Sequence, residues 1–282
     1  ELLRHLDPAR DLYLLDHRLD GKPVFPAACA MELMAEVAER GWPEWQVQAI
    51  ESFRVVKGIV LEDGPRAVKV IARAETQPDP ERGGLAVDLS IVDPASGRPY
   101  YRGAVRLGDR LPEPPDAGLA ALSAPRPFPK SLRGAYDDWL FHGPLFHGLT
   151  SIDRLGDDGI TGSIVPSAPE RCIAGAAGTG WLIDPVVVDS AFQLGILYAR
   201  AQYDVTPLPA RFRSYRRFAP LATPAIRCEF RARALAGPSV LEIQIALHGP
   251  DGRLLGLLED MELSCSRELN RLAGRGATGP TR

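Results

Sequence analysis

The sequence predicts an α+β fold of two similar halves, in each of which an antiparallel sheet wraps around one central apolar helix. Two apolar segments, residues 27–40 and 186–202, lack the wide polar face of an ordinary surface helix. Each is followed by short segments in which apolar and polar residues alternate, as in strands with one buried face. A sheet that curls around a helix buries that helix on most sides, which accounts for both observations.

The first half is expected to begin with an apolar strand at residue 14, which leads through a tight turn into the helix at 27–40. In that turn Gly21 permits a backbone with φ > 0, and Pro26 ends the extended segment before the helix. Strands are then expected at residues 48–61, 66–75, 85–92 and 98–107, separated by turns at 62–65, 78–84 and 93–97. A helix followed by an antiparallel meander results.

A proline-rich connector at residues 108–130 separates the halves. It holds six prolines and little periodicity, so we expect an extended path over the surface. Beyond it the pattern restarts, with strands at 149–155 and 159–166, a glycine-rich loop at 175–180, the helix at 186–202, and strands at 226–235, 240–248 and 254–264. The last strand pair of each half is joined by a Gly-Arg turn, which indicates an internal duplication.

This arrangement is a double hot-dog fold. We expect an N-terminal module at residues 1–107, the connector at 108–130, a C-terminal module at 131–268 and a flexible linker tail at 269–282. Because the chain begins with Glu1 and ends in this polar tail, we expect a domain excised from a larger polypeptide, the alternative being a trimmed free-standing protein.

Composition excludes several classes of protein. The 282 residues are 45% hydrophobic and 24% charged with a net charge of −3, which is typical of a soluble globular protein and gives no reason to expect nucleic acid. Four scattered cysteines are too few for a disulfide framework in a chain this long, so we expect reduced thiols. Without a signal peptide or an apolar run long enough for a membrane span, a cytoplasmic protein that binds no membrane is expected.

His17 is the first candidate catalytic residue, because it precedes the turn that leads into the first apolar helix. A neutral imidazole at this place is suited to removing a proton next to a carbonyl, since the helix N-terminus offers N–H groups to the developing oxyanion. The alternative is a core histidine whose ring bonds a backbone carbonyl.

Asp189 and Gln193 are the second candidates, since they lie four residues apart on one face of the second apolar helix. Asp184, before Pro185, is explained as an N-terminal cap, but a buried Asp189 needs a partner or a role. A desolvated carboxyl keeps its proton more readily, so Asp189 is able to donate to a leaving hydroxyl, with Gln193 orienting it. The alternative is an aspartate bonded to nearby backbone.

These residues form two motifs, H-x-x-x-G-x-x-x-x-P at His17, Gly21 and Pro26, and D-x-x-x-Q at Asp189 and Gln193. In this order the sequence resembles the dehydratase domains of polyketide synthases. The resemblance implies a double hot-dog fold and loss of water from a β-hydroxyacyl chain, with His17 as base, Asp189 as acid and Gln193 holding Asp189. It also implies that an acyl carrier protein presents the substrate on phosphopantetheine, that other synthase domains are neighbours, and that no metal or dissociable cofactor is used; a homodimer is left open.

Residues 141–149, FHGPLFHGL, resemble the family segment Y-G-P-x-F-x-G-L, in which an aromatic-rich loop closes over the substrate. The resemblance implies substrate-binding roles for Gly21, Pro26, His142, Gly143, Pro144 and Phe146. His142 replaces the tyrosine of many members, as in iterative synthases of the enediyne and polyunsaturated fatty acid types, and His147 replaces a common glutamine. The alternative for both histidines is ordinary loop packing.

An arginine cluster at Arg211, Arg213, Arg216 and Arg217 is a candidate surface for docking the acidic carrier protein, the alternative being a solvated strand face. Three other functions stay open: a product-template-like domain that directs cyclisation, a catalytically inactive domain kept for carrier docking or dimerisation, and a free-standing hydratase acting on acyl-CoA. Gln193 argues against the first, because those domains usually carry asparagine there.

Overall fold

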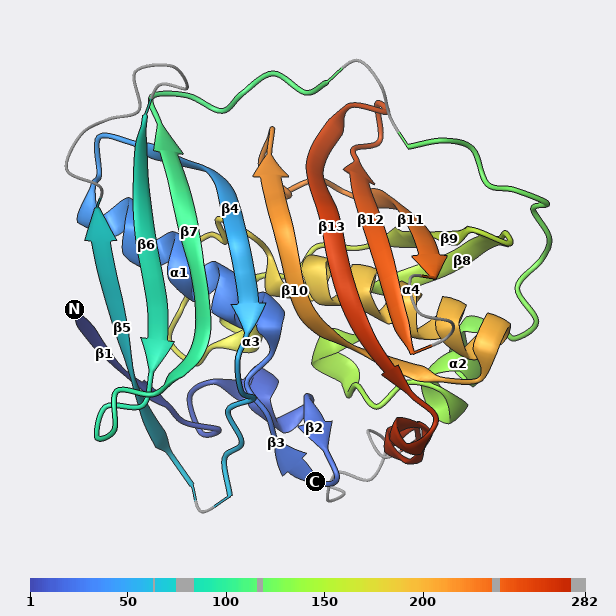
Figure 1. Cartoon of the computed structure of the whole chain (residues 1–282), viewed down its shortest axis with the longest axis horizontal. Coiled ribbons are helices and arrows are strands. Elements are labelled where there is room, and N and C mark those ends of the chain that lie inside the picture. The colour runs from blue at the N-terminus through green and yellow to red at the C-terminus, as the bar shows by residue number, and fades with distance from the viewer. Residues whose placement is uncertain (63, 75–83, 116–118, 235–238, 275–282) are drawn as a thin grey trace.

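The computed structural model describes residues 1–62, 64–74, 84–115, 119–234 and 239–274, and its main feature is a single antiparallel sheet (Figure 1). The strands are β1 (Leu2–Leu6), β4 (Gln46–Val55), β5 (Arg66–Ala74), β6 (Leu85–Val92), β7 (Pro99–Gly108), β8 (Leu149–Leu155), β9 (Gly159–Ile164), β10 (Thr206–Arg217), β11 (Ile226–Ala234), β12 (Val240–His248) and β13 (Leu254–Ser266). Their order is β1-β5-β6-β7-β4-β10-β13-β12-β11-β9-β8.

The two halves of the chain are joined through this sheet. The first half supplies β1 to β7 and the second supplies β8 to β13, and antiparallel pairing of β4 with β10 fuses them into one 11-stranded layer. At the seam the rings of Phe53 and Phe212 stack with centroids 4.9 Å apart. The double hot-dog architecture is confirmed, with the addition that its two sheets are continuous.

Two long helices lie behind the sheet, one behind each half (Figure 1). They are α1 (Ala27–Gly41) and α4 (Pro185–Tyr203), and both agree closely with the predicted apolar segments. Asp184 caps α4 as expected, because its carboxylate accepts hydrogen bonds from the N–H groups of Val186 and Val187. The helix ends at Asp204, which adopts a left-handed backbone conformation.

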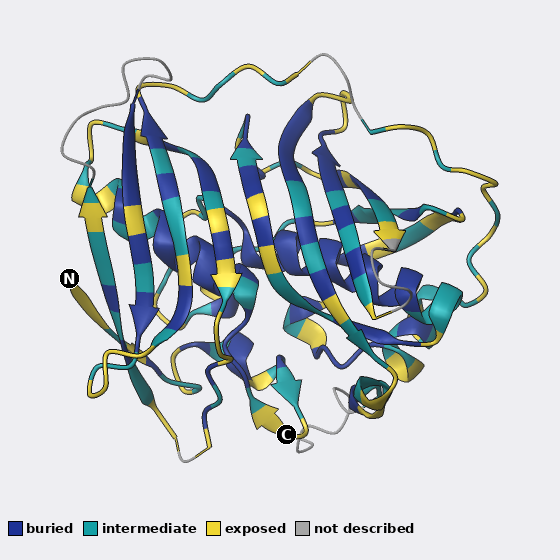
Figure 2. Cartoon of the chain, in the orientation of Figure 1, coloured by how far each residue is buried: buried dark blue, intermediate teal, exposed yellow. Residues whose placement is uncertain are grey.

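The face of the sheet that contacts the helices holds the core, whereas exposed residues appear at intervals along the strands on the face toward the viewer in Figure 2. Fifteen residues of α4 are buried, so this helix has no polar face. Buried Glu32 of α1 connects the halves, since its carboxyl accepts hydrogen bonds from the N–H groups of Leu182 and Ile183, just before α4. Desolvation raises the pKa of Glu32 to about 8.

Several shorter elements were not predicted. They are β2 (Arg18–Leu19), β3 (Lys22–Pro23), α2 (Leu132–Asp138), α3 (Pro169–Cys172) and 3₁₀ turns at Leu12–Leu15, Pro144–Phe146 and Glu268–Leu272. The strand expected from residue 14 is wrong, because the chain there leaves the 3₁₀ turn and enters the small β2–β3 hairpin. The expected linker tail starts with packed residues: Leu272 is buried and Asn270 bonds Thr206.

The strand expected at 48–61 ends at Val55, and residues 56–61 instead cross the chain at 23–25. We call residues 56–61 the strap. The Phe25 N–H donates to the Ile59 carbonyl, and the Leu61 N–H donates to the Pro23 carbonyl. Residue 63, part of the next expected turn, lies outside the described residues, as do 78–83 of the second turn, 116–118 of the connector and 275–282 of the tail.

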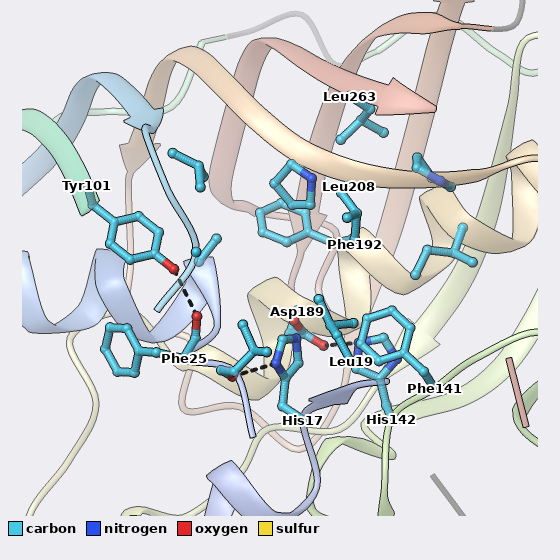
Figure 3. Close-up of a pocket in the computed structure, with 17 residues that line it drawn as sticks. His17, Leu19, Phe25, Tyr101, Phe141, His142, Asp189, Phe192, Leu208 and Leu263 are labelled. Atoms are coloured by element: carbon cyan, nitrogen blue, oxygen red, sulfur yellow. Dashed lines mark hydrogen bonds and ion pairs between the residues drawn. The ribbon is translucent and has the colours of Figure 1, made fainter. Parts of the chain in front are cut away.

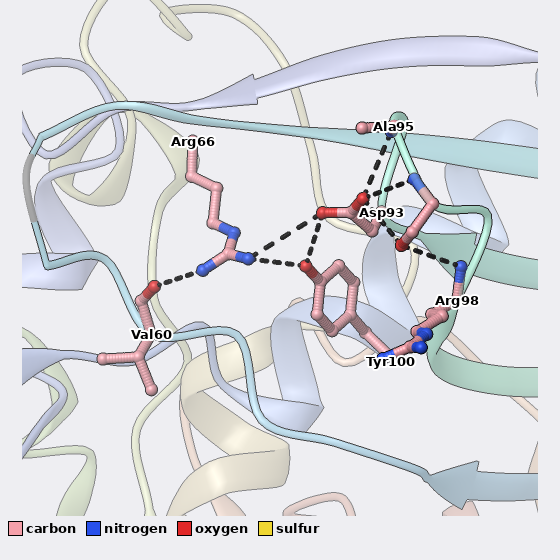
Figure 4. Close-up of polar contacts among 7 residues, drawn as sticks. Val60, Arg66, Asp93, Ala95, Arg98 and Tyr100 are labelled. Carbon is pink, nitrogen blue, oxygen red and sulfur yellow. Dashed lines mark hydrogen bonds and ion pairs between the residues drawn. The ribbon is translucent and has the colours of Figure 1, made fainter.

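A polar network holds the strap in place (Figure 4). Arg66 donates to the Val60 carbonyl at 2.9 Å and to the Tyr100 hydroxyl at 2.6 Å, and Tyr100 donates to the Asp93 carboxylate at 3.0 Å. Hydrogen bonds from Ser96, in the turn expected at 93–97, lower the pKa of Asp93 to about 2. Arg66 therefore fixes a segment that pairs with Val24, close to His17 in the chain.

Among the described residues, no helix is both long enough and apolar enough to cross a membrane.

Candidate active site

A cavity of about 190 Å³ lies between the two halves of the molecule (Figure 3). Its walls come from both modules and are almost entirely apolar: Leu19, Val24, Phe25, Ala27, Val55, Gly58, Tyr101, Phe141, Phe192, Ile196, Pro207, Leu208, Pro209 and Leu263. His17, His142 and Asp189 gather at one end of it, whereas Leu263 and Tyr101 lie apart from them in Figure 3. The cavity thus combines apolar walls with one concentrated polar group.

His17 lies directly before β2, and its ring is fixed by one hydrogen bond. Nδ1 lies 2.7 Å from the carbonyl oxygen of Val24, so Nδ1 carries the proton and donates. Nε2 is then unprotonated and available as a base. Because the side chain is buried, desolvation lowers the pKa of His17 to about 4, and the imidazole is neutral at pH 7. The contact with a backbone carbonyl that the alternative interpretation expected is thus present, and it leaves Nε2 without a proton.

Asp189 lies in the second turn of α4 and is also buried. The Gln193 side-chain amide, one turn further on, donates to Asp189 Oδ2 at 2.9 Å, as the spacing of four predicts. Gln193 itself is held by the carbonyl of Phe146, to which it donates at 2.9 Å, and by the Tyr136 hydroxyl, which donates to it at 3.1 Å. Desolvation raises the pKa of Asp189 to about 7, so a large fraction keeps its proton near neutral pH.

The structure brings the two distant motifs together. One donor atom each from His17, His142 and Asp189 lies within 4.8 Å of the others, and His142 Nε2 is 3.2 Å from Asp189 Oδ2. Donors this close are able to bind a transition metal once the carboxyl has lost its proton. A neutral imidazole facing a protonated carboxyl is also what a proton-transfer elimination needs, with the base and the acid both in reach of one substrate.

The remaining residues of the two motifs support the site from outside the cavity. Gly21 occupies the exposed β2–β3 turn with φ +79°, where a side chain would be strained. Pro26 precedes the first residue of α1. Neither lines the cavity in the part of the chain that the structure describes.

The segment at 142–146 is fastened to the chain around His17. The Gly143 N–H donates to the Asp16 carbonyl at 2.7 Å, and the Leu145 N–H donates to the Asp16 carboxylate at 2.8 Å. A Cβ at Gly143 would lie 2.4 Å from Asp16 Oδ1, which explains the glycine. Pro144 starts the 3₁₀ turn, and the buried Phe146 ring lies 5.6 Å from that of His17. Of these residues only His142 lines the described cavity.

His147 supports the same segment from outside. Its ring packs on Tyr136 with centroids 3.9 Å apart, and its Nε2 lies 3.0 Å from the carbonyl oxygen of His142. Tyr136 and Asp16 were not identified from the sequence, because nothing in their spacing links them to the motifs. Only the folded chain shows that both hold residues of the site.

The arginine cluster lies on β10, and its charge is largely neutralised by acidic residues of the adjacent strand β13. Arg211 pairs with Glu262, Arg213 with Asp260 and Glu259, and Arg216 with Glu259. Arg217 is buried and donates to the Val47 carbonyl at 3.3 Å. The cluster is therefore part of a mixed-charge strand face, which offers little net positive charge to an acidic partner.

The chain matches known families over most of its length. A family model described as polyketide synthase dehydratase N-terminal domain matches residues 116–273, more than half of the chain, and one described as polyketide synthase dehydratase domain matches residues 2–88.

Two curated relatives are similar in sequence. A polyunsaturated fatty acid synthase polypeptide of Thraustochytrium sp. is 27% identical over 215 residues, which cover 74% of this chain and 7% of the relative. Mycoketide-CoA synthase of Mycobacterium tuberculosis is 28% identical over 208 residues, 71% of this chain and 5% of the relative. The chain thus spans less than a tenth of either relative's length.

Solved structures agree on the fold. The dehydratase domain from the CurJ module of curacin polyketide synthase has a TM-score of 0.70 at 15% identity, covering 96% of this chain and 92% of that one. The dehydratase domain of PpsC from Mycobacterium tuberculosis has a TM-score of 0.70 at 17% identity, covering 94% and 92%. With the family models spanning both modules, these findings show that the chain belongs to the polyketide synthase dehydratase family.

Proposed function

We propose that this domain removes water from a β-hydroxyacyl thioester, with His17 as the base and Asp189 as the acid. Membership of the dehydratase family supports the reaction. The observation that carries the residue roles is the pairing, at one end of an apolar cavity, of an imidazole whose pKa is lowered with a carboxyl whose pKa is raised. Each group is thereby in the protonation state that its role requires at neutral pH.

His17 starts the reaction through Nε2, which removes the proton from the α-carbon next to the thioester carbonyl. The Val24 carbonyl holds the Nδ1–H and stabilises the imidazolium that forms. Charge that develops on the thioester oxygen needs N–H donors or a favourable dipole. The N-terminus of α1 opens on the cavity at Ala27 and supplies both, since the first N–H groups of a helix have no partner within it.

Asp189 completes the reaction by giving its proton to the β-hydroxyl. The C–H electron pair becomes the new α,β double bond, the β-carbon–oxygen bond breaks, and the oxygen leaves as water. His17 is then protonated and Asp189 ionised, and the proton returns from the first to the second across a gap of at most 4.8 Å or through the water formed. Gln193 keeps a hydrogen bond to Asp189 throughout.

We propose an acyl carrier protein as the partner that delivers the substrate. The apolar walls suit an acyl chain, and the PpsC dehydratase was solved in complex with C12:1-CoA. The curated relatives are many times longer than this chain, which supports neighbouring domains of a multidomain synthase.

All four cysteines are free, in keeping with a reducing cytoplasm.

The test is turnover of a β-hydroxyacyl N-acetylcysteamine thioester by His17→Ala and Asp189→Asn. Both variants are expected to fold and to lose at least ~100-fold in kcat, the usual contribution of a general acid or base. His5→Ala and Asp88→Asn are matched controls, because these residues are exposed and do not line the cavity. Wild-type turnover in His17→Ala or Asp189→Asn would contradict the assignment, and conversion of a poly-β-ketone thioester instead would favour the product-template alternative.

A further inference from the structure

His142 is held in a single orientation beside Asp189. Its ring is buried and stacks on Phe141, with centroids 4.0 Å apart and planes at 25°. Its backbone pairs with that of His17 in an isolated β-bridge, and His147 lies against its carbonyl. A ring fixed from both the backbone and the face has little freedom to turn away from the carboxyl.

The environment of the two ring nitrogens determines which of them carries the proton. Nε2 lies 3.2 Å from Asp189 Oδ2, whereas Nδ1 is buried and has no hydrogen-bond partner among the residues that the structure describes. A buried N–H without an acceptor is costly, so the proton belongs on Nε2, which has the Asp189 carboxyl within reach. His142 is therefore a neutral donor to the carboxyl.

Gln193 donates to the same oxygen at 2.9 Å, so the Gln193 amide nitrogen and His142 Nε2 both lie within 3.2 Å of Oδ2. An oxygen that accepts two hydrogen bonds is the carbonyl-like oxygen of a protonated carboxyl, which leaves the proton on Oδ1. We propose that His142 is a positioning residue which, together with Gln193, clamps Oδ2 of Asp189 and so presents the Oδ1–H to the substrate's β-hydroxyl. This inference rests on the proposed function, because it refines how its acid works.

No fixed charge lies next to this clamp in the described residues. The titratable groups that face Asp189 are His17 and His142 from the loops, Cys29 of α1 and Tyr136 of α2. Burial lowers the pKa of both imidazoles and raises the pKa of Cys29 and of Tyr136, so all four are neutral at pH 7. The N–H donors on Oδ2 are then what stabilises the carboxylate, and removing one weakens Asp189 as an acid.

The test compares His142→Phe, which keeps a flat ring without a donor, with His142→Gln, whose amide nitrogen reaches the place of Nε2. For His142→Phe we expect kcat to fall about 10- to 100-fold with little change in KM. We also expect the pH at which kcat declines on the alkaline side to move about one pH unit higher. For His142→Gln we expect kcat within about threefold of wild type and an unmoved limb. If kcat of His142→Phe had the wild-type value and the wild-type pH dependence, the proposal would be overturned. An equal loss of kcat in His142→Phe and His142→Gln would also overturn it, because His142 itself would then be the acid.

A second readout does not depend on turnover. The ¹³C carboxyl signal of Asp189, assigned by its loss in Asp189→Asn, should titrate at higher pH in His142→Phe and at the wild-type pH in His142→Gln. If the carboxyl signal titrates with the same midpoint in wild type, His142→Phe and His142→Gln, the clamp is overturned. If the midpoint shifts as expected but the wild-type protein does not turn over the β-hydroxyacyl thioester, the clamp is supported and the proposed function is refuted. Loss of wild-type activity on chelation with EDTA would also overturn it, because a metal would then occupy Oδ2.

Discussion

Replacing Asp189 by asparagine should stabilise the protein in a pH-dependent way while abolishing the reaction. Burial raises the pKa of this carboxyl from its ordinary 3.8 to about 7 in the native state. Between those values the native protein holds one proton that the unfolded chain has released, so wild-type stability falls by about 1.4 kcal/mol per pH unit as pH rises toward 7, and no further above it. The ionised, buried carboxyl therefore costs about 4 kcal/mol in all.

The asparagine side chain in Asp189→Asn cannot titrate, but its amide oxygen still accepts from Gln193. The free energy of unfolding of Asp189→Asn relative to wild type should thus increase by about 2 kcal/mol between pH 5.5 and 8.5, since about 1.5 pH units of that range lie below the native pKa. Urea denaturation at both pH values measures this difference. Asp88→Asn, on the exposed side of β6, is the control for the same substitution at the surface. A pH-independent difference for Asp189→Asn would refute the raised pKa and, with it, the assignment of the acid.

Three further outcomes are expected. First, kcat/KM should be bell-shaped, with limbs near pH 4 for His17 and pH 7 for Asp189; activity that rises steadily from pH 7 to 9 would contradict these roles. Second, Glu32→Ala should lower the free energy of unfolding by about 2–4 kcal/mol in urea, because the buried N–H of Ile183 and the part-buried N–H of Leu182 lose their acceptor; a loss below about 1 kcal/mol would contradict the link between the halves. Third, Gly58 is an exposed residue of the strap at the cavity, so Gly58→Phe should lower kcat/KM for a long acyl thioester about tenfold. The urea midpoint of Gly58→Phe should equal that of wild type, since open space surrounds that position. If Gly58→Phe and wild type had equal kcat/KM, the substrate would enter elsewhere.

The sequence predicted the elements that are indicated by a pattern of residues within a single short segment. The apolar helices α1 and α4 were located to within about two residues, because burial on nearly all faces leaves a pattern that no turn or strand shares. The spacing of four between Asp189 and Gln193 likewise fixed their hydrogen bond in advance, since an α-helix brings such residues to one face.

Features that depend on segments far apart in the chain were not predictable in this way. The strand β10 contains two prolines and alternates with arginines, so its pairing with β4 gives no local signal, and the acids that neutralise it come from β13. The strap continues the strand pattern of β4 but leaves the sheet, because its partners are residues 23–25. The 3.2 Å approach of His142 Nε2 to Asp189 Oδ2 likewise joins segments far apart in the chain.

The central claim is that His17 and Asp189 act on neighbouring carbons of one substrate. A crystal structure of the domain with a β-hydroxyacyl pantetheine amide, which cannot be hydrolysed as a thioester, tests it most directly. We predict the β-oxygen within about 2.6–3.2 Å of an Asp189 carboxyl oxygen, with the α-carbon facing His17 Nε2 and the acyl chain along the apolar walls. An analogue bound outside this cavity, or with its β-oxygen turned away from Asp189, would contradict the claim.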